Sequence, residues 1–182
     1  FFAARKELHD RNALAHRRVL VAIGHDRGVA LASHDDTTVE HVVESVADRV
    51  SVAEFPTTVE AARASHAAGL SVLMGAPNVV RGGSHSGNVS ARELAEAGVL
   101  DILSSDYVPV SLIEGAFGIA DVPAIGGLAG AIRTVTKNPA DATGFTDRGE
   151  IAPAKRGDLV RVRLVDGHPV VREVFRLGRR VS

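Results

Sequence analysis

A short apolar run leads directly into a glycine-rich polar stretch at residues 70–88, LSVLMGAPNVVRGGSHSGN. Residues 70–74 are typical of a buried strand, and the stretch after them is predicted to be a loop. Glycine lets backbone N–H groups approach a ligand closely, and the Arg, His, Ser and Asn side chains donate hydrogen bonds to phosphate-like oxygens. We therefore interpret the loop as an anion site rather than a plain surface turn. Its candidate binding residues are Asn78, Arg81, Gly82, Gly83, Ser84, His85 and Ser86.

The order of strand, polar turn and helix occurs four times in the first three quarters of the chain. The apolar runs lie at residues 29–33, 50–53, 70–74 and 99–103. This spacing predicts consecutive βα units and a parallel sheet, with the 29–33 strand buried on both faces. Polar residues that can do chemistry follow each run, at the carboxyl ends of the strands, where α/β sheets and (β/α)₈ barrels place active sites.

Helix signals agree with this order. An amphipathic pattern from the first residue is predicted to end at Gly24, and one long helix is expected over residues 123–136. Thr37 or Thr38 is placed to cap the helix that begins near Val39. Capping-box spacing occurs twice, in the pairs Thr57–Glu60 and Ser90–Glu93.

From Gly149 onward the apolar pattern changes to a period of two. Residues 159–165 and 170–177 flank an Asp166–Gly167 turn and predict an antiparallel hairpin. Its arginines are interpreted as a solvated face rather than an anion site; they are Arg161, Arg163, Arg172 and Arg176. We therefore divide the chain into a main α/β segment, 1–148, and a small β segment, 149–182.

Composition narrows the class of partner. The 182 residues are 45% hydrophobic, which is enough for a buried core, and 21 basic and 22 acidic residues mix to a net charge of −1. The chain has no basic stripe for nucleic acid and no polybasic membrane tail, so we expect a small-molecule partner. Cysteine is absent, which leaves His, Asp and Glu as strong metal ligands. No membrane-spanning run or signal peptide is visible, so we expect a cytoplasmic location.

Candidate chemical groups stand at three predicted strand ends. His34 is placed to ligate a divalent metal through one ring nitrogen. Asp106 is predicted to be a second, oxygen ligand or a general base for water. Glu54 is a third ligand, a base, or the partner of a lysine or arginine. Thr57 and Thr58 are interpreted first as helix caps and second as ligand contacts.

Several strings of the sequence together carry a family resemblance. They are HDDTT at 34–38, EFPTT at 54–58, MGAPN at 74–78 with RGGSHSGN at 81–88, LSSDY at 103–107, TKNPA at 136–140, GEI at 149–151 and KRGDLV at 155–160. From about Val19 onward the chain resembles the phosphonate-metabolism diphosphatases of the amidohydrolase superfamily, and the string at 81–88 is the most specific.

The resemblance implies a fold and a reaction. It implies the C-terminal part of a (β/α)₈ hydrolase barrel, about four βα units, followed by a small β segment. The implied reaction releases pyrophosphate from a methylphosphonate-bearing ribose 5-triphosphate with the help of a divalent ion, Zn, Mn or Mg. By position, the resemblance implies that His34 and Asp106 are metal ligands. From the residues themselves we expect Asp106 and Glu54 to be catalytic groups, and the loop with Thr57 and Thr58 to be the substrate site.

The chain departs from the family pattern in two ways. Glu54 stands where many amidohydrolases have a metal-binding histidine, and the first-strand histidine motif and fourth-strand bridging ligand are missing. Four parallel strands cannot close a barrel and leave unpaired edges. We therefore expect a C-terminal part that pairs with a preceding part or forms a homo-oligomer, and that has little or no activity alone.

Two other functions fit the same residues. One is a generic amidohydrolase that acts on an amide or cyclic imide, although a neutral substrate does not need so many anion donors. The other is a non-catalytic, phosphate-binding half-barrel that works through a partner.

Overall fold

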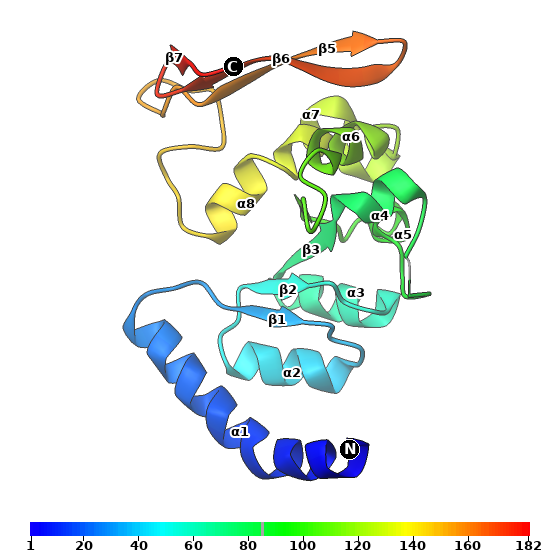
Figure 1. The fold of residues 1–182 in the computed structure, drawn as a ribbon, viewed down its shortest axis with the longest axis vertical. Helices are drawn as coiled ribbons and strands as arrows, with labels where there is room; N and C mark the ends of the chain where they lie inside the picture. The colour runs from blue at the N-terminus through cyan, green and yellow to red at the C-terminus, as the bar shows by residue number, and fades with distance from the viewer. Residues whose placement is uncertain (85) are drawn as a thin grey trace.

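The computed structural model describes residues 1–84 and 86–182 and contains two separate sheets (Figure 1). The first is parallel, in the order β1-β2-β3-β4; its strands are β1 (Ala32–His34), β2 (Val52–Glu54), β3 (Ser71–Gly75) and β4 (Ile102–Ser104). The second is antiparallel and contains β5 (Leu159–Val165), β6 (His168–Arg176) and β7 (Arg179–Arg180). The predicted mixed α/β architecture is confirmed at this level.

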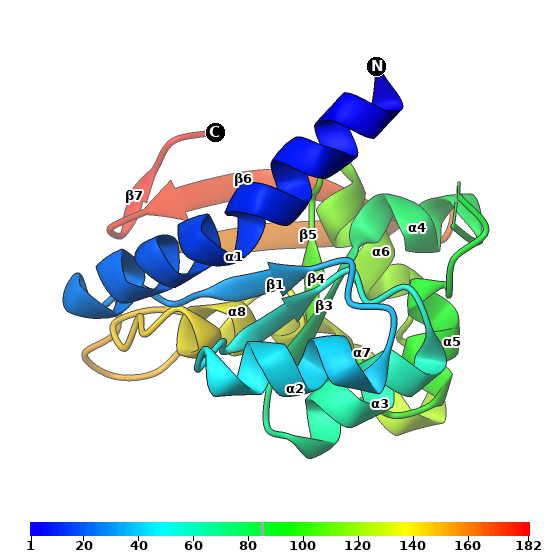
Figure 2. The ribbon, with the colours of Figure 1, turned by 90° about the horizontal axis from the view of Figure 1, so that it is seen from below.

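One helix precedes the parallel sheet, and helices follow each of its strands. They are α1 (Phe2–Asp26), α2 (Val39–Ala47), α3 (Val59–Ala67), α4 (Ala76–Arg81), α5 (Ala91–Glu96), α6 (Ser111–Gly118), the 3₁₀ turn η1 (Pro123–Ile125), α7 (Gly127–Arg133) and α8 (Lys137–Ala142). Figure 2 shows α2 and α3 along one face of the sheet. None of the helices formed by residues 1–84 and 86–182 has the length and apolarity needed to cross a membrane.

The core lies between β3, β4 and the helices that follow them. Val72, Leu94 and Ile119 are fully buried, and Met74 and Leu103 are nearly so. Burial of such side chains stabilises the fold by about 1.5–3 kcal/mol each. The same packing sets the carboxyl ends of β3 and β4 beside each other, because Gly75 is in register with Ser104.

The first strand does not match its prediction. β1 is an edge strand whose end residues Ala32 and His34 are exposed, not a strand buried on both faces. Gly24 does not end α1, which continues to Asp26. Gly24 is instead a close-packing point, because a Cβ there would lie 2.6 Å from Leu31 Cδ2.

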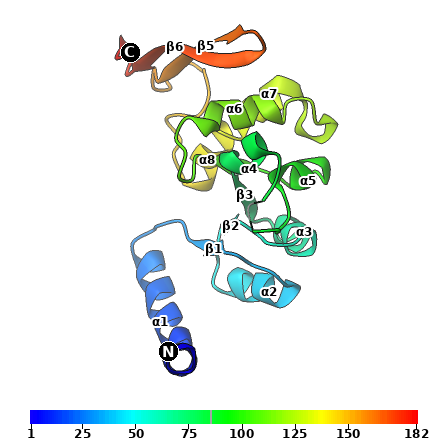
Figure 3. The ribbon, with the colours of Figure 1, turned by 45° about the vertical axis from the view of Figure 1, so that its right-hand side comes forward.

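Helix α1 is held to the body mainly by polar contacts near α2. Arg17 donates hydrogen bonds to Glu44 at 2.9 Å and to Asp48 at 2.5 Å, and His25 Nε2 lies 2.9 Å from the Asp48 carbonyl oxygen. Figure 3 shows α1 and the β5–β6 hairpin at opposite ends of the molecule. Apolar side chains of α1 such as Leu20 are more than half exposed.

The predicted long helix over 123–136 is wrong. Gly126 and Gly127 adopt φ values of +82° and +75°, a left-handed conformation that separates η1 from α7. After α7 the chain runs along the free edge of β4, where Leu103 N–H donates to the Thr134 carbonyl at 3.0 Å and Asn138 Nδ2 donates to the Asp101 carbonyl at 2.8 Å. This segment covers the edge of β4, which was expected from the sequence to be unpaired.

Side-chain caps fix the starts of α2, α3 and α5. Thr38 and Thr58 each accept a hydrogen bond from the backbone three residues on. Thr57 is therefore not the cap, and the predicted Thr57–Glu60 capping box is wrong. The Ser90–Glu93 capping box is confirmed, because Glu93 N donates to Ser90 Oγ at 3.1 Å and Ser90 N donates to Glu93 Oε2 at 2.8 Å.

Replacing Ser90 with Ala tests this cap. We expect Ser90→Ala to lower the free energy of unfolding by about 1 kcal/mol, while Ser90→Asp, an equally good cap, keeps most of it. The pKa of Glu93 is held below its ordinary value mainly by a hydrogen bond with the Ser90 side chain, and to a smaller extent by one with the Ser90 backbone. A depressed carboxyl pKa stabilises the fold above the unfolded-state value, about pH 4.3, so the deficit of Ser90→Ala should narrow as the pH falls through the lower, folded-state pKa. Urea melts at several pH values would check this, and an equal loss in both variants would contradict it.

The hairpin is confirmed. Asp166 and Gly167 have φ values of +50° and +83°, as a two-residue type I′ turn needs. Its four predicted arginines are exposed, and Glu173 pairs with Arg161 at 2.7 Å and with Arg180 at 3.2 Å. The sequence prediction omitted the short strand β7.

Helices α4 and α6 pack with their backbones close together at Gly115. A Cβ at Gly115 would lie 2.8 Å from Ala76 Cβ and 3.2 Å from Ala76 Cα, both rigid atoms. The overpacking of Gly115→Ala, about 1–3 kcal/mol, outweighs the gain of about 1 kcal/mol in helix propensity, so we expect a net loss of stability. Thermal melts would measure it against Gly83→Ala, where a Cβ meets nothing within 4 Å. A melting temperature of Gly115→Ala equal to that of Gly83→Ala would contradict this.

Candidate functional site

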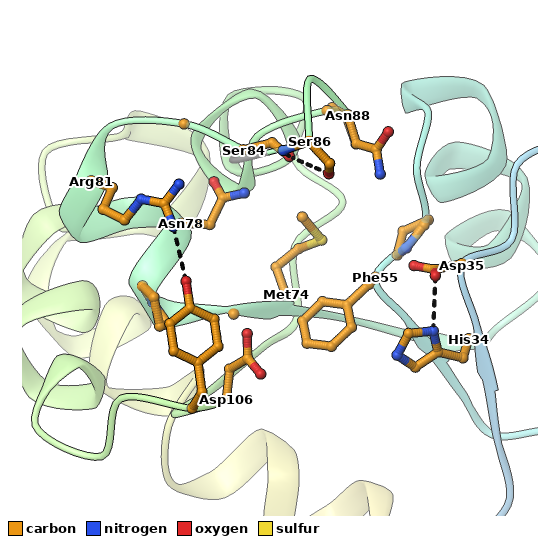
Figure 4. A pocket seen from close by; sticks show the side chains of 16 residues that line it. His34, Asp35, Phe55, Met74, Asn78, Arg81, Ser84, Ser86, Asn88 and Asp106 are labelled. Carbon is orange, nitrogen blue, oxygen red and sulfur yellow. Dashed lines mark hydrogen bonds and ion pairs between the residues drawn. The ribbon is translucent and has the colours of Figure 1, made fainter.

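A pocket of about 560 Å³ opens at the carboxyl ends of the parallel strands (Figure 4). The residues that line the pocket include an apolar floor and a polar rim. The apolar floor consists of Phe55, Pro56, Met74, Pro77 and Val89. The polar rim consists of Arg81, Gly83, Ser84 and Ser86, and the remaining lining residues are His34, Asp35, Gly75, Asn78, Asn88, Asp106 and Tyr107. The pocket lies at the edge of the sheet where the sequence places the candidate residues.

Three lining residues have left-handed backbones. Asp35, Phe55 and Asp106 have φ values of +61°, +53° and +47°, and each directly follows a strand or lies two residues beyond it. Such values are uncommon outside glycine, and for a bulky residue like Phe they are costly. Hydrogen bonds along the ladder hold two of them, from Asp35 N to the Glu54 carbonyl at 3.0 Å and from Phe55 N to the Leu73 carbonyl at 2.9 Å. The sheet turns these residues toward one pocket.

The predicted metal ligand His34 lies between two acidic groups. Its Nδ1 is 3.2 Å from Asp35 Oδ2 and its Nε2 is 3.9 Å from Glu54 Oε2. The Phe55 ring packs edge-on against the imidazole, with the centroids 5.4 Å apart and the planes at 77°. Glu54 does not line the pocket and has no lysine or arginine within 4 Å among the described residues. Asp36 turns inward and accepts a hydrogen bond from Ser33 at 2.6 Å.

Asp106 presents a free carboxylate to the pocket. Among the described residues, no hydrogen-bond or salt-bridge partner engages it. Gly75 leaves space next to it, because a Cβ there would lie 3.3 Å from Asp106 Oδ2 and 3.5 Å from Phe55 Cε1. Asp106 can therefore accept a proton or a hydrogen bond from a ligand without first breaking an internal contact.

The described residues do not by themselves form a metal centre. Residues 1–84 and 86–182 contain no group of three or more His, Asp or Glu side chains that could hold an ion. His34 is the last residue of the outer strand β1, and Asp106 lies two residues after the outer strand β4. Both residues line one pocket, and among the described residues they do not by themselves complete a metal site.

The predicted anion loop begins as a helix. Residues 76–81 form α4, with Pro77 in its first turn, where proline is favoured, and left-handed Gly82 at its carboxyl end. Asn78 Oδ1 accepts a hydrogen bond from Ala91 N at 2.9 Å and so ties α4 to α5. Arg81, in the last turn, donates to the Tyr107 hydroxyl at 2.9 Å.

The rest of the anion-binding stretch partly lines the pocket. The Ser84 and Ser86 hydroxyl oxygens are 3.1 Å apart, and both residues lie in the rim with Gly83. Gly82 does not line the pocket; it ends α4. His85, also predicted to bind substrate, lies outside the described residues.

Thr57 and Thr58 do not line the pocket but connect its loops. Thr57 N–H donates to the Asp36 carbonyl at 2.9 Å, and the Thr57 hydroxyl donates to Thr37 Oγ1 at 2.9 Å. Thr58 caps α3 and donates to the Thr37 carbonyl at 2.9 Å. Val89 N–H donates to the Thr57 carbonyl at 3.1 Å, which extends this framework to the apolar floor.

The apolar floor and Tyr107 are not among the candidate site residues predicted from the sequence. The hydrophobic residues follow or end predicted strands, so their type indicated core rather than pocket. A signal existed for Phe55, because the EFPTT string places it at the same strand-end position as Asp35 in HDDTT.

Among known protein families, no family model matches the chain. Over 166 residues it is 54% identical to the alpha-D-ribose 1-methylphosphonate 5-triphosphate diphosphatase of Escherichia coli (strain K12). The chain is similar to this diphosphatase. The resemblance predicted from the sequence strings is thereby confirmed.

The similarity covers 91% of this chain but only 44% of the Escherichia coli diphosphatase, so the chain spans less than half the length of that relative. The crystal structure of an uncharacterized protein has a TM-score of 0.68 and 20% sequence identity, and the match covers 90% of this chain and 48% of that one. At this identity the likeness supports the fold alone.

Proposed function

We propose that the pocket binds the triphosphate of a ribose 5-triphosphate, and that the full-length protein containing this chain releases pyrophosphate from alpha-D-ribose 1-methylphosphonate 5-triphosphate. The similarity to the Escherichia coli diphosphatase supports the substrate. The arrangement of the pocket supports a ligand with phosphoryl groups. Arg81 and the Ser84 and Ser86 hydroxyls lie in the same pocket as the free carboxylate of Asp106.

The observation that carries the proposal is the uncompensated charge of Arg81. Arg81 has no carboxylate within 4 Å among the described residues, and its hydrogen-bond partner is a neutral phenol. Arg92, by contrast, donates to both Glu96 and Asp121. An arginine whose charge is not already neutralised can form charge-assisted hydrogen bonds to phosphoryl oxygens.

We assign roles from this geometry. The polar rim binds the phosphoryl oxygens and the departing pyrophosphate, and donors placed where negative charge develops stabilise the transition state. Asp106 takes the proton of the attacking water as the new oxygen–phosphorus bond forms and the bond to pyrophosphate breaks. The apolar floor provides a surface for the carbon face of the ribose.

We also propose that the four βα units belong to a (β/α)₈ amidohydrolase barrel, in which a further part pairs with the open edge of β1. His34 and Asp106 would each supply one donor to a divalent ion, and the other donors come from that further part. When bound, such an ion contributes Lewis acidity. We assign no step to it, because the described residues do not complete its site.

Phosphorus NMR tests the reaction. The full-length protein, supplied with divalent metal and alpha-D-ribose 1-methylphosphonate 5-triphosphate, should produce pyrophosphate and the 5-phosphate together in equimolar amounts, so the pyrophosphate signal should have twice the intensity of the 5-phosphate signal. Release of orthophosphate alone, or no change in the spectrum, would overturn the proposal.

The chain alone is expected to behave differently. Residues 1–182 purified by themselves should show little or no pyrophosphate release at metal concentrations that saturate the full-length protein, because only two of the proposed ligands are present. The same NMR assay on both proteins would measure this. Comparable rates would show that the described residues hold a sufficient centre.

A second candidate is a non-catalytic, phosphate-binding module. The absence of a three-donor metal group among the described residues favours it. Titration of the full-length protein with inorganic tripolyphosphate, with and without divalent metal, separates the two. Metal-independent binding together with no turnover of the ribose 5-triphosphate would favour the module.

A further inference from the structure

A hydrogen bond between Arg81 and Tyr107 joins two chain segments that line the pocket. The Arg81 guanidinium, at the end of α4, donates to the Tyr107 hydroxyl, which follows β4, over 2.9 Å (Figure 4). Both residues line the pocket, and the Tyr107 side chain is 60% exposed. Tyr107 is therefore accessible to a ligand in the pocket.

We propose that Tyr107 is a positioning residue: its hydroxyl oxygen accepts a hydrogen bond from Arg81 and holds the guanidinium over the pocket, where Arg81 binds phosphoryl oxygens. This rests on the proposed function, since it specifies how that site grips a polyphosphate.

Both ends of the bridge are anchored. On the Arg81 side, Gly83 N–H donates to the Asn78 carbonyl at 2.9 Å, and Gly115 packs against Ala76 at the start of α4. On the Tyr107 side, a turn closes with Val108 N–H donating to the Ser105 carbonyl at 2.9 Å. The bridge thus joins two fixed points, so its formation orders a long arginine side chain before a ligand arrives.

The nature of the partner matters as much as its position. A carboxylate would also orient Arg81 but would neutralise it, as Asp121 does for Arg92. A phenol orients the guanidinium and leaves its full charge for an anion. Preorganisation of this kind improves affinity by reducing the rotamer entropy lost on binding.

A double-mutant cycle tests the proposal in the full-length protein. Isothermal titration with inorganic pyrophosphate would be carried out on the parent, Tyr107→Phe, Arg81→Ala and the double variant. Loss of a hydrogen bond to a charged group should weaken binding by Tyr107→Phe about tenfold. In the Arg81→Ala background the same change should have less than a third of that effect. Arg172→Ala, an exposed arginine on the hairpin, is the control and should bind like the parent.

The experiment distinguishes failure of the positioning role of Tyr107 from failure of the proposed function. Coupled losses of pyrophosphate affinity without any turnover would retain the positioning role and reject the reaction. Turnover with additive losses, or with parent-like pyrophosphate affinity in Tyr107→Phe, would overturn the positioning role and leave the reaction intact. Equal melting temperatures of the parent and Tyr107→Phe would confirm that the effect is not one of folding.

Discussion

Asp106→Asn should lower kcat for pyrophosphate release by the full-length protein by about 10²–10⁴-fold, the usual contribution of a general base. The amide cannot accept the proton of the attacking water, although it keeps the shape of the carboxylate. Asparagine tolerates the left-handed backbone at φ +47°, so we expect the variant to fold. Initial rates from phosphorus NMR or a coupled pyrophosphate assay would measure the loss.

Asp166→Asn is the matched control for this change. Asp166 has nearly the same backbone conformation, φ +50°, but lies in the hairpin turn. We expect parent-like rates and stability from it. If Asp106→Asn kept the parent rate, Asp106 would not be the base, and the free carboxylate would need another explanation.

Arg81→Ala is expected to have the second large effect. Removal of a preorganised donor to developing negative charge typically costs about 10²–10³-fold in kcat, and KM should rise because the same group binds the ground-state triphosphate. Metal content should be unchanged, since Arg81 is not a metal donor. Steady-state kinetics and metal analysis of the same preparation would check both parts.

Arg172→Ala again serves as the control for a lost surface arginine. A fall in the metal content of Arg81→Ala would contradict our assignment, because it would show that the segment around the polar rim supports the ions rather than the substrate. Parent-like kinetics would remove the observation on which the proposed function rests.

Much of the fold was predictable because it depends on local signals. The Ser90–Glu93 capping box, the Asp166–Gly167 turn and the four short apolar runs each reflect the preferences of a few neighbouring residues. The order of these signals was sufficient to predict a parallel sheet with polar residues at one edge.

The errors came where local signals compete with packing. Residues 76–81 read as a glycine-rich loop, yet Pro77 starts a helical turn that packs against Gly115. The run at 29–33 read as a buried strand, but β1 stands at the edge of the sheet and lacks a neighbour on one side. Neither outcome depends on the residues of the segment alone.

For the candidate site, the sequence alone determined which groups stand at the ends of the strands, because strand, turn and helix alternate with a fixed spacing. It placed His34 and Asp106 at the same edge and put Arg81 near them. It could not determine which side chains meet. The contact of Phe55 with His34 and the Arg81–Tyr107 hydrogen bond join residues far apart in the chain. They depend on strand register and left-handed backbone turns, which are set by the packing of the whole sheet.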